Sequence, residues 1–321
     1  MVDGNANYTN TLLTMTLEKF LSDKAADTIF QSTPLIDMLK SRSKTSTKGG
    51  TKLLEMLMYA KNTTVGSYAG YDPLDVTPQE GFTNAEFDWK EFGGSLAISQ
   101  AELDKNSGEP QVASMLEAKW EQLRMSLEDE MNRLSFLDGT GNGSKDPTGL
   151  ALMVDSAGTY GNIVRSANSW WASIENASGG VLQIEGTVGM KRTFNQASYG
   201  RAQKAPNLGI TTQIAYEAYE ALMAPYLRYS VEGEANAVFK RDNLKFRGMP
   251  LFWDGYCQSG IMYMLNTDFI RFVTHSDRDF KVRPFMEPAN STSKVALITW
   301  MGNLTCSNCR HQAKITGITN S

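Results

Sequence analysis

The stretch QVASMLEAKWEQLRMSLEDEMNRLSF, residues 111–136, is the strongest fold signal in the chain. Its apolar residues recur at steps of three and four, the period of one helix face, with no Gly or Pro among them: Val112, Leu116, Trp120, Leu123, Leu127, Met131 and Leu134. Pro110 stands where a first helical residue is expected, and Gly139 follows the last apolar position. The pattern predicts a helix over 110–136, about 39 Å long. Alone, it describes an ordinary core helix, so its flanks must carry the functional information.

Composition excludes several classes of protein. The chain has 321 residues, of which 41% are hydrophobic and 21% charged, which is typical of a globular protein. Its net charge of -4 is not that of a dedicated nucleic-acid binder. No run of 18 apolar residues or signal-peptide pattern occurs, so no membrane partner is expected. Three cysteines, an odd number in a long chain, favour reduced thiols and an intracellular origin.

The first 86 residues contain two stretches without an evident core of their own. Residues 1–49 read as an arm with one or two short helices that lies on another surface, either of its own domain or of a neighbour. The basic run 40–52 favours a solvated loop, or one that meets a neighbour's carboxylates. After a strand-like run at 51–60, residues 60–86 are loop-like, but their tyrosines and apolar residues argue against disorder. We expect something outside this fold to stabilise that loop.

The remainder alternates strands and helices. Residues 87–99 predict β structure with a bulge or bend at Gly93–Gly94, and 101–105 predict a short helix. Helices are further predicted over 181–199 and over 213–226 at most, where Pro225 ends the second. A strand pair is predicted over 238–254, turning at Gly248. Further strands are predicted at 261–265, 269–273, 280–285, 294–306 and 311–318; the 294–306 strand is apolar on both faces and should be covered on both.

No catalytic constellation is found. The Gly-rich run 136–154 ends a helix, and Asp146 follows Lys145 where a phosphate loop needs Ser or Thr, so we reject nucleotide binding there. Cys306, Cys309 and His311 could supply three zinc ligands, but no second pair occurs, and buried or turn thiols are the favoured interpretation. His275 lies in no metal-binding pattern. The sequence therefore predicts no catalytic, cofactor-binding or metal-binding residue, no cofactor, and no enzyme.

The order of the segments resembles a known family. Residues 84–109 (NAEFDWKEFGGSLAISQAELDKNSGE) resemble the approach to the peripheral domain of the major capsid proteins of tailed bacteriophages, which have the Hong Kong-type capsid fold. The helix 110–136 resembles their spine helix, and 136–150 its exit turn. Two further strings are similar to parts of the family's axial domain: its strand-to-helix step (208–222) and the strand pair that closes it (244–254 with 261–266). The last string, 294–318, is similar to the C-terminal return strands of the peripheral domain. Six strings follow the family's order and are spread over most of the chain, from residue 84 to residue 318.

The resemblance implies an α+β fold and a domain division. The expected parts are an N-terminal arm (1–49), an extended β-hairpin loop (50–86), a peripheral domain with the spine helix (87–149), an axial domain (150–266), and return strands of the peripheral domain (267–321). It also implies a structural role, in which copies assemble as hexamers and pentamers into the icosahedral head enclosing a double-stranded DNA genome. We expect assembly in the host cytoplasm and a final location in the virion.

Further partners follow from the same resemblance. Because arm-like sequence starts at Met1, we expect a separate scaffolding protein. The resemblance also implies a portal and leaves the presence of decoration proteins open. Contact with packaged DNA should be non-specific, with Lys191, Arg192, Arg201, Lys204 or the 40–52 run as candidates that subunit salt bridges explain equally well. Some members of the family form covalent Lys–Asn cross-links between subunits. Lys52 and Lys61 are candidates for such a bond by location only, and we predict no cross-link. The alternatives are an encapsulin-type shell around a cargo enzyme, and a cytosolic enzyme that uses Cys306, Cys309 and His311.

Overall fold

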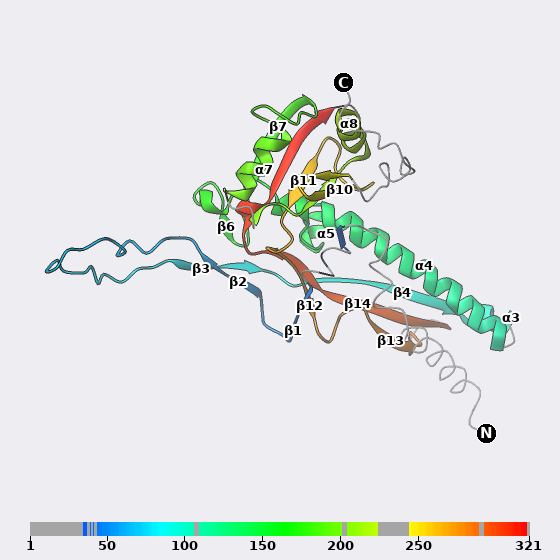
Figure 1. Ribbon diagram of the computed structural model, residues 1–321. Helices are drawn as coiled ribbons and strands as arrows, with labels where there is room; N and C mark the ends of the chain where they lie inside the picture. The colour runs from blue at the N-terminus through cyan, green and yellow to red at the C-terminus, as the bar shows by residue number, and fades with distance from the viewer. Residues whose placement is uncertain are drawn as a thin grey trace, which may run out of the picture.

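The computed structural model describes residues 35, 36, 39, 41, 44–105, 109–200, 204–223, 244–288 and 292–319. Within them, two sheets, a long helix and a projecting hairpin make up the molecule (Figure 1). The rest of the predicted arm and the first part of the predicted 238–254 strand pair lie outside the described residues. Strands and helices occur in both sheet regions, which confirms the expected α+β class.

The first sheet is organised around one long strand, β14 (Ser293–Cys306). β4 (Lys90–Ser99) pairs antiparallel with it over ten residues, from Ser99 opposite Ser293 to Lys90 opposite Gly302. On its other side, β14 pairs first with β13 (Lys281–Met286) and then with β12 (Ile270–His275). Side chains of β14 alternate between half-buried and buried up to residue 301 and are then all buried, so the expectation of a strand covered on both faces holds for its second half.

The long helix α4 (Glu109–Phe136) confirms the prediction that opened the sequence analysis. It packs on β4, and the apolar face predicted from the sequence is buried at Leu116, Trp120, Leu127, Met131 and Leu134. Burial of this stripe is what stabilises a helix of this length, since propensity alone contributes little. The short helix α3 (Gln100–Lys105) precedes it, with a capping box in which Glu102 N donates to Ser99 Oγ and Ser99 N to Glu102 Oε2.

Gly93 and Gly94 form no bulge, so that part of the bulge-or-bend prediction is wrong. The β4–β14 register runs through both residues without a shift. Their role is to let β4 lie close to the neighbouring strand β14 and to the helix α4 that covers it. A Cβ on Gly93 would lie 2.5 Å from the carbonyl oxygen of Ile298, and one on Gly94 would lie 2.7 Å from Cδ1 of Leu123 on α4.

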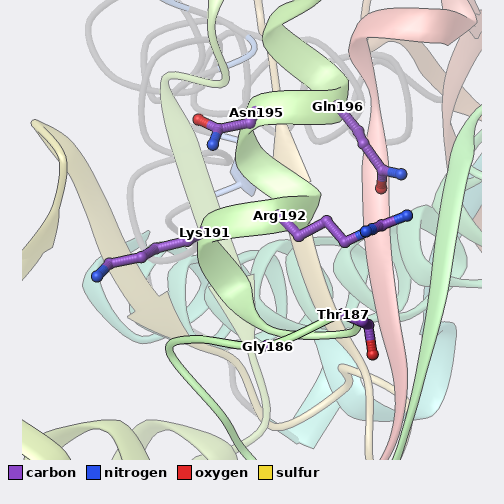
Figure 2. Close-up of a pocket in the computed structure, with 6 residues that line it drawn as sticks. All are labelled: Gly186, Thr187, Lys191, Arg192, Asn195 and Gln196. Carbon is purple, nitrogen blue, oxygen red and sulfur yellow. The ribbon is translucent and has the colours of Figure 1, made fainter.

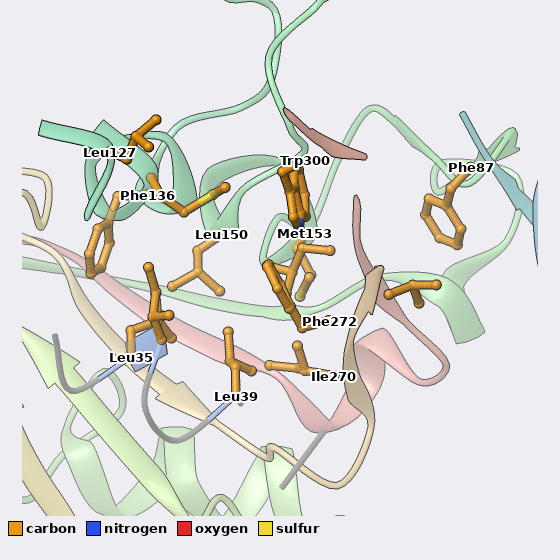
Figure 3. Packing of buried hydrophobic residues seen from close by; sticks show 14 of the residues in the cluster. Leu35, Leu39, Phe87, Leu127, Phe136, Leu150, Met153, Ile270, Phe272 and Trp300 are labelled. Atoms are coloured by element: carbon orange, nitrogen blue, oxygen red, sulfur yellow. The ribbon is translucent and has the colours of Figure 1, made fainter. Parts of the chain in front are cut away.

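Part of the predicted arm belongs to the first sheet. β1 (Lys44–Thr47) pairs parallel with β12, and Lys44 Nζ lies 2.6 Å from Asp279 Oδ2. The prediction of a solvated loop over 40–52 is therefore wrong for these four residues, because their backbone finds a free sheet edge. Leu35 and Leu39 are buried in the same core beside Leu150, Ile270 and Phe272 (Figure 3).

The second sheet has six strands in the order β7-β15-β11-β8-β10-β9. These strands span Ile174–Val181, Ala313–Thr319, Met262–Leu265, Leu208–Thr211, Met249–Trp253 and Lys245–Phe246, respectively. β9 and β10 turn at Gly248 as predicted, and α8 (Gln213–Met223) ends inside its predicted limit. Helix α7 (Met190–Ser198) is shorter than the predicted 181–199, since β7 runs to Val181 and Gly186 takes a φ of +100° in the connecting turn.

The C-terminal strand β15 lies in a different sheet from β14. It pairs parallel with β7 and antiparallel with β11, and so belongs to the six-stranded sheet. The 3-10 helix Cys309–His311 lies between β14 and β15, where the chain passes from the first sheet to the second. Five short elements lie between α4 and β7: α5 (Gly141–Ser144), α6 (Leu150–Met153), the paired strands β5 (Thr159–Tyr160) and β6 (Ile163–Val164), and the 3-10 helix Ser169–Trp171.

Candidate assembly surface

A two-stranded hairpin projects from the first sheet (Figure 1). β2 (Leu53–Met58) pairs antiparallel with β3 (Phe82–Phe87), and pairing ends where Met58 faces Phe82. The inner face of β2 is buried at Leu53, Glu55 and Leu57. The strand thus alternates strictly between covered and exposed side chains.

Polar contacts fix the root of the hairpin to the sheet. The Glu55 carboxylate is 6% exposed; Arg271 Nη1 on β12 donates to its Oε2 at 2.9 Å, and Thr305 Oγ1 on β14 to its Oε1 at 3.1 Å. Trp89 Nε1 donates to the Gly50 carbonyl at 2.8 Å. Because a buried carboxylate is costly unless paired, these bonds hold the hairpin in one direction.

The outer face of the hairpin is apolar and exposed. We call Leu54, Met56, Met58 and Phe82 the outer row; they share one face of the ribbon, and their exposed fractions are 61%, 73%, 75% and 68%. Large apolar side chains gathered in this way mark an interaction surface in a water-soluble molecule. The sequence signal for it was present, since the run LLEMLM is apolar at positions on both strand faces. A strand prediction for this run gives no account of which neighbour covers its second face.

Beyond the strands, the loop 59–81 is stabilised by local contacts. Thr63 Oγ1 donates to Gln79 Oε1, Ala69 N to Asp72 Oδ2, and the Thr77 hydroxyl and amide to Asp75 Oδ1. Its large apolar side chains are exposed, and those of Val65, Tyr71 and Val76 nearly fully so. These short-range bonds set the shape of the loop but leave most of its apolar surface uncovered.

Two hollows flank the hairpin root. Tyr59 stacks on Trp170 with ring centroids 5.5 Å apart. A hollow of about 300 Å³ on one side is bordered by Met58, Tyr199 and Arg310, and one of about 520 Å³ on the other by Phe82 and Val164. The apolar surface of the outer row therefore continues onto the body of the molecule.

The basic residues singled out from the sequence lie on two separate surfaces. Lys52 Nζ pairs with Glu86 Oε2 at 2.7 Å on the hairpin, where Lys61 is exposed. Lys191 pairs with Glu185 and Arg192 is exposed, both at a shallow hollow of about 630 Å³ on α7 (Figure 2). Lys204 Nζ lies 4.7 Å from the Phe269 ring centroid, and Arg201 lies outside the described residues.

The cysteine and histidine candidates are in the interior. Cys306 and Cys309 are fully buried, and burial raises the pKa of the Cys306 thiol well above its usual value. His311 Nδ1 lies 2.6 Å from the Ala197 carbonyl oxygen, and its ring stacks on Phe269. Among the described residues, no three His, Cys, Asp or Glu side chains are grouped so as to hold a metal ion. In the same part of the chain, no helix is long and apolar enough to cross a bilayer.

Comparisons with known proteins identify the architecture. No protein-family model matches the sequence, and the search of curated proteins returns no match. Among solved structures, the capsid of cyanophage A-1(L) aligns with a TM-score of 0.67 and 14% identity over 92% of this chain and 96% of that one. The capsid of Myoviridae phage XM1 aligns with a TM-score of 0.57 and 9% identity, covering 94% of this chain and 98% of that one. The capsid of a native GTA particle aligns with a TM-score of 0.54 and 11% identity, covering 88% of this chain and 90% of that one. The chain has the Hong Kong-type fold of phage major capsid proteins.

Proposed function

We propose that this chain is the major capsid subunit of a tailed phage and builds the icosahedral head shell around double-stranded DNA. The observation that carries the proposal is the likeness to the cyanophage A-1(L) capsid protein, which extends over more than nine-tenths of both chains. A match of that extent includes the hairpin region and both sheets rather than one common module.

The exposed apolar surface supports the same role. The outer row and the loop 59–81 expose large side chains that other copies of the chain would cover in a shell. Covering a Met or Phe of this kind is worth about 1.5–3 kcal/mol, so a few such contacts per subunit are enough to hold copies together. Such a role requires neither a catalytic site nor a cofactor.

The proposal includes finer points. Copies would form hexamers and pentamers in the host cytoplasm and end in the virion, with a separate scaffolding protein, a portal, decoration proteins and sequence-neutral DNA contact. The division into 1–49, 50–86, 87–149, 150–266 and 267–321 stays a prediction. Its support is that the strands between residues 174 and 265 lie in the six-stranded sheet, whereas β4, β12, β13 and β14 lie in the first. β15 is the exception.

Electron microscopy of the expressed full chain tests the proposal. We expect closed shells, or irregular polymers that become regular when a scaffolding protein is co-expressed. A protein that remains monomeric at high concentration, with and without scaffold, would refute it. Mass analysis of immature particles tests the scaffold, since a longer precursor of this chain would contradict a separate one.

The encapsulin-type alternative predicts a different content. Such shells enclose a protein cargo, so particles from the native source would carry an enzyme and no genome. The solved structures reported above come from phage and GTA particles, which favours the head shell. Nuclease-protected DNA of genome length in native particles is the expected result.

A further inference from the structure

The exposed side of α7 carries positive charge without a free carboxylate in the described residues. Its solvent-facing residues are Lys191, Arg192, Asn195 and Gln196 (Figure 2), and the exposed Tyr199 caps its C-terminus. Arg247 Nη1 donates to Asn195 Oδ1 at 2.6 Å, and the Arg310 guanidinium lies 4.8 Å from the Tyr199 ring centroid. The carboxylate bound at this surface is Glu185, paired with Lys191. We call this surface the basic face.

The exposed side of α8 has the opposite character. The helix reads QIAYEAYEALM and contains no Lys or Arg. Ala215 and Tyr219 are buried, while Gln213, Ile214 and Glu217 are exposed and Glu220 is half-buried. Gln213 Nε2 donates to Glu217 Oε1 at 2.8 Å, and no cation of the described residues pairs with Glu217 or Glu220. We call this surface the acidic face.

The two faces belong to one layer of the molecule but do not meet. Phe246 of β9 lies between the helices, 5.8 Å from the Phe194 ring and 6.2 Å from the Tyr219 ring, measured between centroids. α7 covers β7 and β15, whereas α8 packs mainly on β10; the two helices flank β15 in Figure 1. No ion pair joins α7 to α8 in the described part of the chain. Among the described residues, Arg192 on the basic face and Glu217 and Glu220 on the acidic face have no ion-pair partner, whereas Lys191 is paired with Glu185.

We propose that the basic face of one copy binds the acidic face of the next copy, with Lys191 and Arg192 opposite Glu217 and Glu220. A contact between two different patches repeats head to tail and closes into a ring when the rotation allows. Exposed Tyr199 and Ile214 supply apolar contact beside the charges. The inference rests on the proposed shell function, because it names the surfaces that join copies within a ring.

Phosphate is the competing partner for the basic face. Its cations and amide side chains could also contact a nucleic-acid backbone. Two observations favour a second copy as the partner. The chain's net charge of -4 opposes binding to a polyanion, and every copy carries one acidic face on α8 for each basic face on α7. The experiment below separates the two partners.

Charge reversal provides the test. The full chain is expressed as the basic-face variant (Lys191→Glu with Arg192→Glu), the acidic-face variant (Glu217→Lys with Glu220→Lys) and the combination of all four changes. Lys281→Glu with Arg283→Glu, on exposed positions of β13, makes the same charge change elsewhere. We expect each single-face variant to lose about tenfold or more in shell yield, and the combination to recover to within about twofold of wild type. The β13 variant should assemble normally.

Mixing the two failing variants gives a second readout. One variant then carries two acidic faces and the other two basic faces, so only alternating neighbours attract. Six-membered rings satisfy alternation and five-membered rings cannot. We therefore expect the mixture to give sheets or tubes of hexamers without closed shells.

Three results would overturn the inference. These are normal assembly of the single-face variants, no recovery in the combination, or normal shells of the basic-face variant that have lost bound nucleic acid, which would assign the face to phosphate. If wild type forms no shells, the proposed function fails separately. The contact is then read by mixing Arg192→Cys and Glu217→Cys chains with a short bismaleimide, and the absence of a cross-linked pair refutes it.

Discussion

The side-chain amide Nδ2 of Asn132 donates to both carboxylate oxygens of Asp254, at 3.1 and 3.0 Å. Asn132 is on α4 and Asp254 directly follows β10, so this contact joins the long helix to the six-stranded sheet. Tyr256 N donates to Asp254 Oδ1 at 2.9 Å, and the Tyr256 hydroxyl donates to Asp129 Oδ1 at 2.6 Å. Polar bonds, as well as apolar packing, therefore fix the position of α4 relative to the six-stranded sheet.

Asn132→Leu should destabilise the subunit by about 2–4 kcal/mol, because it leaves the buried Asp254 carboxylate without its amide donor. Urea unfolding of the unassembled subunit measures this loss. Gln122→Leu, an exposed amide on the same helix, is the matched control and should stay within about 0.5 kcal/mol of wild type. Equal stability of the two variants would show that the Asn132–Asp254 contact contributes nothing.

Gly93→Ala should cost more stability than Gly94→Ala. The new Cβ at residue 93 meets the backbone oxygen of Ile298 at 2.5 Å, whereas at residue 94 it meets the end of the flexible Leu123 side chain at 2.7 Å. We expect a loss of about 2–3 kcal/mol for the first and about 1 kcal/mol for the second. Gly180→Ala on β7, where nothing lies within 4 Å of the added Cβ, is the control in thermal unfolding.

How far the sequence predicts this fold depends on the range of the interactions. The period in 110–136 is a local property and predicted α4 almost to the residue, and the helix predicted over 213–226 at most contains α8. Strand partners are not local. A short basic run such as Lys44–Thr47 has no apolar pattern, yet it becomes a strand because β12 presents an unpaired edge.

The candidate surface shows the same limit. The sequence indicated that residues 60–86 lack partners within the fold. It did not indicate that Met56 and Met58 share an exposed face, because that depends on the contacts of Glu55 with Arg271 and Thr305, which are far away in the sequence. Likewise, Gly93–Gly94 has the composition of a bulge, and only the closeness of α4 and β14 explains the two glycines. The opposite charges of α7 and α8 are visible in the sequence, but their place on one layer is not.

The three thiols should be unreactive in the folded subunit. Cys257, Cys306 and Cys309 are buried, and burial raises the pKa of the Cys257 thiol to about 12. Little thiolate is present at pH 8, so we expect less than one thiol labelled in native protein and three in urea. Because the folded pKa lies above the unfolded one, this thiol's contribution to stability is complete below about pH 9 and is lost as the pH rises toward 12. Rapid native labelling at pH 8 would show that the sheet opens or that the thiols lie near the surface.

Replacing two residues of the outer row should abolish assembly while leaving the fold intact. Met56 and Met58 are 73% and 75% exposed, so Met56→Gln with Met58→Gln removes apolar surface without opening the core. Urea unfolding of the unassembled variant should match wild type within about 0.5 kcal/mol, whereas shell yield should fall about tenfold or more, because about 1.5–3 kcal/mol is lost for each Met that a neighbour covers. Met286→Gln, an exposed Met on β13, is the control and should assemble normally. If the double variant formed shells as well as wild type does, the outer row would not be the surface that copies cover; if its subunit unfolded more easily, the row would serve the fold rather than the shell.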